Sequence, residues 1–97
     1  MLDSLNVEVF AKYLNQTFRL HHGSKTMEVE LTEAKDLGPG SKEGGRNAFS
    51  LIFRGAKEPV LDQQIYKIEH GEMGSVELFL VPVGQDEAGT LYQAIFN

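Results

Sequence analysis

Three histidines carry the most versatile chemistry in this sequence, because a neutral imidazole can bind a metal ion or transfer a proton near pH 7. His21 and His22 are adjacent, so in a strand their side chains point to opposite faces and cannot share an ion. His70 follows Glu69, and no second histidine stands at a spacing typical of a metal site. We therefore expect no metal site and no cofactor, and we expect the imidazoles to lie exposed in turns.

A glycine-rich segment, from Gly40 to Arg46, contains a lysine and an arginine and therefore raises the question of phosphate binding. It lacks the G-x-x-x-x-G-K-[S/T] order, and the residues after it are typical of a strand, whereas a phosphate loop leads into a helix. No serine lies in a G-x-S-x-G motif, and the absence of cysteine excludes thiol catalysis, disulfide bonds and cysteine-bound zinc. An enzyme would have to use carboxylates together with His70, in a cleft between the helix and the sheet.

Three positively charged residues have placements that suggest specific contacts. Arg54 ends an aromatic strand, and its guanidinium can reach Glu69 or Glu77 if these acids lie on neighbouring strands. We expect a structural ion pair there. Lys42 and Arg46 fall in the glycine-rich segment, which we expect to be exposed, so they are the candidates for contact with a partner.

The composition bounds the class of protein. The 97 residues are 41% hydrophobic and 24% charged, which is ordinary for one small globular domain. The net charge of −5 disfavours nucleic acid and anionic membranes as partners, because both require a basic face. The first residues include an acid where a signal peptide has bases, and no stretch approaches the roughly 20 apolar residues of a membrane span. A cytoplasmic location is therefore expected.

The N-terminal residues have the pattern of a short helix. Asp3 and Ser4 are both good N-caps, and apolar residues recur every four positions from Leu5 to Tyr13. The pattern predicts a helix over about residues 5–14.

Beyond this helix the apolar period changes to two, which is typical of half-buried strands. Phe49, Leu51 and Phe53, for example, would share one face. Residues 36–47 are rich in glycine and are expected to form a long mobile loop. The expected fold is mainly β, a small antiparallel six-stranded barrel or two-layer sandwich with one N-terminal α-helix covering an open end or face. Strands are expected over about residues 17–20, 26–34, 48–54, 64–70, 75–83 and 90–96.

Several strand segments together resemble an uncharacterised bacterial family, a domain of unknown function of about this length. The resemblance is carried by Phe-Ser-Leu-x-Phe-Arg-Gly at residues 49–55, by Glu-Leu-Phe-Leu-Val-Pro at residues 77–82, and by the segments at 66–70 and 92–97. This chain has Ala48 where the family usually carries a proline. Its glycine-rich loop also looks longer than is typical, so the resemblance implies the fold more firmly than the shape of this loop.

The resemblance brings no assigned activity. It implies an accessory or adaptor role beside phage-tail-like or surface-fibre genes. The leading hypothesis is a small non-enzymatic binding or assembly module that acts on a protein partner through a sheet edge and the 36–47 loop, and a homo-oligomer is among the assemblies it allows. The alternatives are the small enzyme that uses carboxylates and His70, and a structural subunit of a larger particle.

Overall fold

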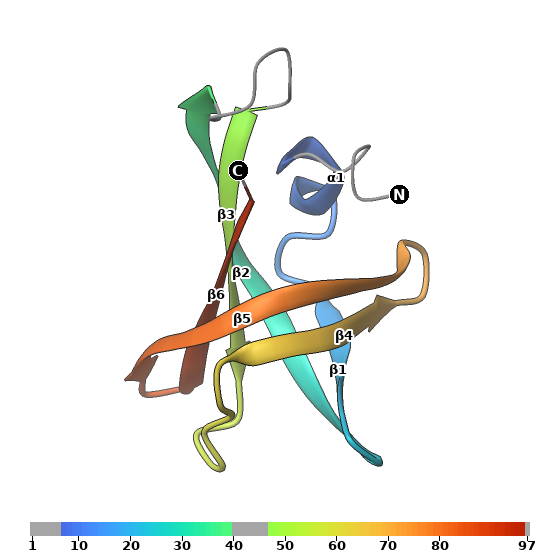
Figure 1. Cartoon of the computed structure of the whole chain (residues 1–97), viewed down its shortest axis with the longest axis vertical. Coiled ribbons are helices and arrows are strands. Elements are labelled where there is room, and N and C mark those ends of the chain that lie inside the picture. The colour runs from blue at the N-terminus through green and yellow to red at the C-terminus, as the bar shows by residue number, and fades with distance from the viewer. Residues whose placement is uncertain (1–6, 40–46, 97) are drawn as a thin grey trace.

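The computed structural model describes residues 7–39 and 47–96. Its elements are α1 (Val7–Ala11), β1 (Thr17–His22), β2 (Lys25–Pro39), β3 (Asn47–Gly55), β4 (Gln64–His70), β5 (Gly74–Asp86) and β6 (Gly89–Phe96). The six strands form a closed antiparallel barrel in the order β1-β2-β3-β6-β5-β4, and β4 pairs with β1 to complete the ring (Figure 1). The mainly β fold with one N-terminal helix is thus confirmed, and the barrel is the correct one of the two expected architectures.

The helix ends earlier than its apolar pattern predicted. It stops at Ala11, and residues 12–15 form a turn in which Asn15 has a φ of 67°. The reason is a competing contact with β2: the Asn15 N–H donates to the Leu31 carbonyl at 2.7 Å, and the Leu31 N–H donates to the Gln16 carbonyl at 3.1 Å. The chain must leave the helix to make these bonds, and asparagine tolerates the left-handed conformation that the exit requires.

The prediction of a loop over all of residues 36–47 was also wrong. β2 continues to Pro39 and β3 begins at Asn47, so only residues 40–46 separate the two strands, and these lie outside the described part of the chain. Gly38 lies at an irregularity in the pairing with a φ of 92°, a conformation that glycine adopts without strain. Glycine here allows β2 to continue past the irregularity, whereas the sequence pattern had suggested an end to the strand.

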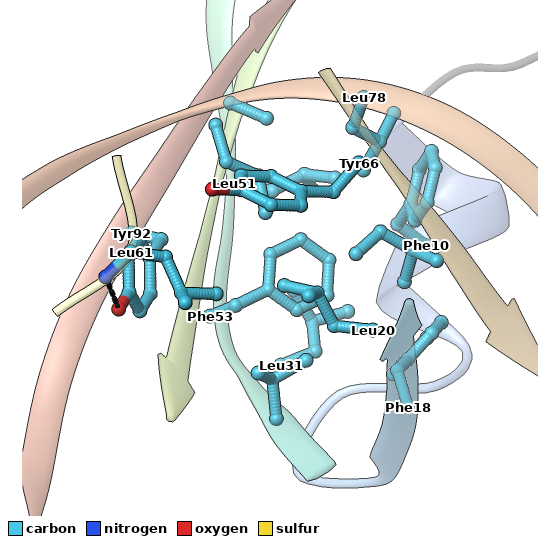
Figure 2. Packing of buried hydrophobic residues seen from close by; sticks show 14 of the residues in the cluster. Phe10, Phe18, Leu20, Leu31, Leu51, Phe53, Leu61, Tyr66, Leu78 and Tyr92 are labelled. Atoms are coloured by element: carbon cyan, nitrogen blue, oxygen red, sulfur yellow. Dashed lines mark hydrogen bonds between the residues drawn. The ribbon is translucent and has the colours of Figure 1, made fainter. Parts of the chain in front are cut away.

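The core consists of the inward-facing side chains of all six strands, together with Phe10 of α1 and Leu61 of the connection between β3 and β4 (Figure 2). On β3, Phe49, Leu51 and Phe53 are buried on one face, as their alternation predicted. The connection between β3 and β4 is held to the barrel by a buried hydrogen bond, in which the Leu61 N–H donates to the Tyr92 hydroxyl oxygen at 2.9 Å. The remaining buried apolar residues of the cluster are Phe10, Phe18, Leu20, Val29, Leu31, Tyr66, Ile68, Leu78, Leu80 and Ala94.

The helix closes an end of the barrel that the strands leave open. Only the second part of β5, from Val81 onward, pairs with β6. The last residues of β6 therefore pair with β3 alone. Phe10 of α1 is fully buried at this place, with ring centroids 5.9 Å from Phe49 and 5.8 Å from Phe96. Phe49 and Phe96 stack on each other at 4.3 Å. Figure 1 shows α1 beside the upper part of β3, above β5.

We expect Phe10→Ala to lower the free energy of unfolding by roughly 3–5 kcal/mol, since it leaves a cavity between α1 and the barrel. Leu14→Ala is the matched control, because Leu14 follows the same helix but is 40% exposed. The Leu14→Ala substitution should lower the free energy of unfolding by no more than about 0.5–1 kcal/mol. Urea unfolding of both variants measures the two values. Equal losses would show that α1 does not seal the barrel through Phe10.

Candidate functional site

A cleft lies where the pairing of β1 with β4 stops, and residues of β1, β2 and β4 line it. Its volume is about 200 Å³. The lining includes a cross-strand row in which Arg19 of β1 lies opposite Glu28 of β2 and opposite Glu69 of β4. Strand register therefore brings one cation between two acids that are distant in sequence. The lining residues are Thr17, Phe18, Arg19, Glu28, Glu69, His70 and Gly71.

The acids of this row do not close on the arginine. In the part of the chain that the structure describes, no carboxylate oxygen comes within 4.0 Å of the Arg19 guanidinium. Glu69 turns instead to His21, whose Nε2–H donates to Glu69 Oε1 at 2.8 Å. This hydrogen bond, helped by the positive charges of Lys67 and Arg19, holds the pKa of the Glu69 carboxyl below its usual value. Arg19 therefore remains exposed in the cleft as a cation without a close ion-pair partner.

His70 joins three parts of the fold beside the cleft. Its Nδ1 accepts the backbone N–H groups of Glu72 and Met73, at 3.0 and 3.3 Å. Since Nδ1 uses its lone pair in this way, the proton lies on Nε2, which donates to Gln16 Oε1 at 2.7 Å. The ring also packs on Tyr13, with centroids 4.5 Å apart. His70 thus fixes the β4–β5 turn against the segment between α1 and β1.

These contacts limit the chemistry of the cleft. The lining does gather His70 with Glu28 and Glu69, which is the set that an enzyme of the expected kind would need. However, neither nitrogen of His70 can exchange a proton with a ligand unless one of its hydrogen bonds breaks. Within residues 7–39 and 47–96, no group of three or more histidine, aspartate or glutamate side chains is placed to hold a metal ion.

Arg54 forms ion pairs, but with different acids from those expected. Its Nε and Nη2 donate to Asp86 Oδ2 at 3.1 and 2.8 Å, and its Nη1 lies 3.7 Å from Glu30. The hydrogen bond to Asp86 raises the pKa of Arg54 and lowers that of Asp86. The expected partners Glu69 and Glu77 lie on β4 and β5. Neither strand is next to β3, which carries Arg54, because the barrel order places β3 between β2 and β6.

Sequence reasoning missed Arg19 and Asp86 as contact residues. A signal for Asp86 was present, because Asp-Glu-Ala-Gly is a typical turn sequence: Asp86 Oδ1 accepts the N–H groups of Ala88 and Gly89 at 2.9 and 3.0 Å. Its pairing with Arg54 depends on strand order, which no local pattern reveals. For Arg19 the signal was its alternation with Phe18, which places Arg19 on the outer face of the strand. That Glu28 and Glu69 lie on either side of Arg19 follows only from the strand register.

Lys42 and Arg46, the residues expected to contact a partner, lie outside the described residues. Their role stays a prediction. No helix in the described part of the chain has the length and apolar character needed to cross a membrane.

A closed barrel of six antiparallel strands, with a helix across one end and a small cleft on its wall, defines the class of this protein as a small helix-capped β-barrel domain. The chain belongs to the family described as Domain of unknown function (DUF6916), whose model matches residues 5–96. The resemblance to an uncharacterised family is therefore confirmed. No curated protein and no solved structure matches the chain significantly.

The His21–Glu69 contact should make stability depend on pH. Because the folded state lowers the pKa of Glu69, the contact stabilises the fold above the usual carboxylate range and is lost as the pH falls through the folded-state value. At pH 7 we expect the melting temperature of wild type to be higher than that of Glu69→Gln. This difference in melting temperature should shrink as the pH falls from about 5 to about 3. Calorimetry across this range measures both proteins. A difference that stays constant with pH would contradict a stabilising role for the ionised carboxylate.

Proposed function

We propose that this domain is a small non-enzymatic binding or assembly module that takes up an extended segment of a protein partner at the free edge of β2, by which we mean the side of residues 32–39 on which no described strand pairs with β2. The supporting observation is the pairing of β2. Its pairing with β1 ends at Glu30, opposite Thr17, and Leu31 then bonds to the turn before β1. From Thr32 to Pro39, within the residues described, β2 has a strand partner only on the β3 side.

A strand paired on one side offers backbone N–H and C=O groups to another chain. Proteins that bind by strand addition obtain affinity from these main-chain bonds and specificity from the side chains beside them. On this edge Glu33, Lys35 and Leu37 are exposed, and Leu37 is 46% exposed. The edge thus combines a negative, a positive and an apolar side chain, which suits a partner strand of mixed polar and apolar character.

The enzyme alternative has one observation in its favour, which is the gathering of His70, Glu28 and Glu69 along one cleft. Two features make it the weaker proposal. The ring nitrogens of His70 are occupied by contacts that hold the fold together. The volume of about 200 Å³ is also below the roughly 300–1,000 Å³ of ordinary small-molecule sites.

The partner that we propose is a protein. The net charge of −5 supports this choice over nucleic acid and anionic lipid. The family resemblance suggests an accessory role in a phage-tail-like or surface-fibre system, acting in the cytoplasm. Proteins encoded beside this gene are therefore the first to test.

The test compares two substitutions of similar exposure. Leu37→Glu changes the β2 edge, and Val60→Glu changes a side chain that is 49% exposed in the connection between β3 and β4. Each variant and the wild type are mixed with the purified tail-like or fibre proteins, and binding is followed by light scattering and interferometry. We expect Leu37→Glu to weaken binding at least about tenfold, and Val60→Glu to leave it unchanged.

Hydrogen exchange then locates the contact. Within residues 32–39, the amides that point away from β3 should become protected in the complex, because these N–H groups would bond to the added strand. The amides that already bond to β3, and that of Gly38, which already donates to Asp36 Oδ1, should change less. A complex that forms without protection of these amides, or that is equally sensitive to Val60→Glu, would overturn strand addition at β2.

A further inference from the structure

The outer face of β4 and β5 carries an apolar pair that no other described element covers. Ile65 of β4 lies directly opposite Phe79 of β5, and these side chains are 63% and 51% exposed. In the next row of the same face, Lys67 lies opposite Glu77, and both are exposed. We call these four residues the β4–β5 face.

The register makes this face complementary to itself. Consider two copies stacked face to face, related by a two-fold axis that lies between them and runs parallel to the strands. The rotation places β4 of one copy on β5 of the other and keeps each row in place. Ile65 then packs on Phe79 of the second copy, and Lys67 meets Glu77 of the second copy. Both contacts occur twice, as a two-fold interface requires.

Charge decides which occupant fits. The β4–β5 face presents one cation and one anion beside its apolar pair, so an acidic or a basic partner would match only half of it. A second copy matches both charges and covers both apolar side chains. We propose that the β4–β5 face binds the same face of a second copy of this chain, forming a two-fold dimer.

This inference is independent of the proposed function, because the β4–β5 face and the free edge of β2 lie on different strands. A dimer formed in this way would carry two β2 edges and could bind a partner with two sites more tightly than a monomer does. Four principal side chains in each copy form a small interface compared with the roughly 800 Å² that each partner buries in a stable complex. The dimer should therefore dissociate on dilution.

The absence of cysteine allows a direct test of the geometry. Ile65→Cys and Phe79→Cys each introduce a single thiol, and the two variants, carrying tags of different size, are mixed in equal amounts and oxidised. We expect the covalent dimer to contain one copy of each variant well above the half that random pairing gives. Each variant alone should form several-fold less covalent dimer than the mixture. Random pairing, or no covalent dimer, would overturn this arrangement.

A second measurement uses charge and needs no cross-link. The mass of wild type, from light scattering, should rise from 10.8 kDa toward twice that value as the protein is concentrated. Lys67→Glu gives a face with two acids and Glu77→Lys gives a face with two bases, so each variant alone should remain monomeric at the concentration where wild type dimerises. Their equal mixture should recover the dimer.

Melting curves confirm that both variants are folded. Wild type that stays monomeric at about 1 mM, well above the Kd of most specific complexes, would overturn the dimer. A mixture that behaves like its separate components would overturn the pairing of Lys67 with Glu77.

Discussion

The structure depends on how a closed ring of unequal strands is sealed. Pairing must be continuous around the ring, yet β5 shares its residues between two neighbours: its first half pairs with β4 and its second half with β6. The end of β6 is therefore exposed on the side that β5 has left, and the aromatic rings of Phe49 and Phe96 would meet solvent there. Phe10 fills this space, and a helix of five residues is enough to deliver it. A helix this short has little stability of its own, so its packing on the barrel, through Phe10 and the partly buried Val7, must hold it.

The same inequality of lengths leaves β2 with a free edge. β1 has six residues and β2 has fifteen, so β1 can cover only the first part of its neighbour. The turn after α1 covers Leu31 through two backbone hydrogen bonds. Beyond that point the described chain supplies no further strand on this side. The feature that supports a binding role is thus a direct consequence of barrel geometry, and its exposed side chains are the ones available to a partner.

Residues that resemble catalytic groups have structural contacts in this fold. His70 joins the helix side, β1 and the β4–β5 turn, and its ring packs between Tyr13 and Phe18, whose ring centroid is 4.9 Å away. Glu69, the preceding residue, is held by His21 on the neighbouring strand. A histidine beside a glutamate in the sequence therefore does not form a pair here, because adjacent residues of a strand point to opposite faces and each finds a different partner.

The sequence by itself determined the class of fold and the inward face of the strands with a clear apolar alternation, such as β3. Alternation of apolar residues identifies buried positions such as Phe49, Leu51 and Phe53, because side chains of a strand alternate between core and solvent with a period of two. Local patterns also indicated six strands and an N-terminal helix, and the strand motifs indicated the family. These features depend on near neighbours in the chain, which is why they can be recognised without the structure.

Only the tertiary structure decided which residues meet. The acid that binds Arg54 is Asp86, because β6 lies between β3 and β5 and the turn after β5 returns the chain to that place. Arg19 lies between Glu28 and Glu69 for a similar reason, since β4 closes the ring against β1. The end of α1 and the continuation of β2 to Pro39 were likewise set by hydrogen bonds between distant segments. Strand order and register are properties of the whole ring, and a shift of one residue would exchange the two faces of a strand, so no local pattern contains them.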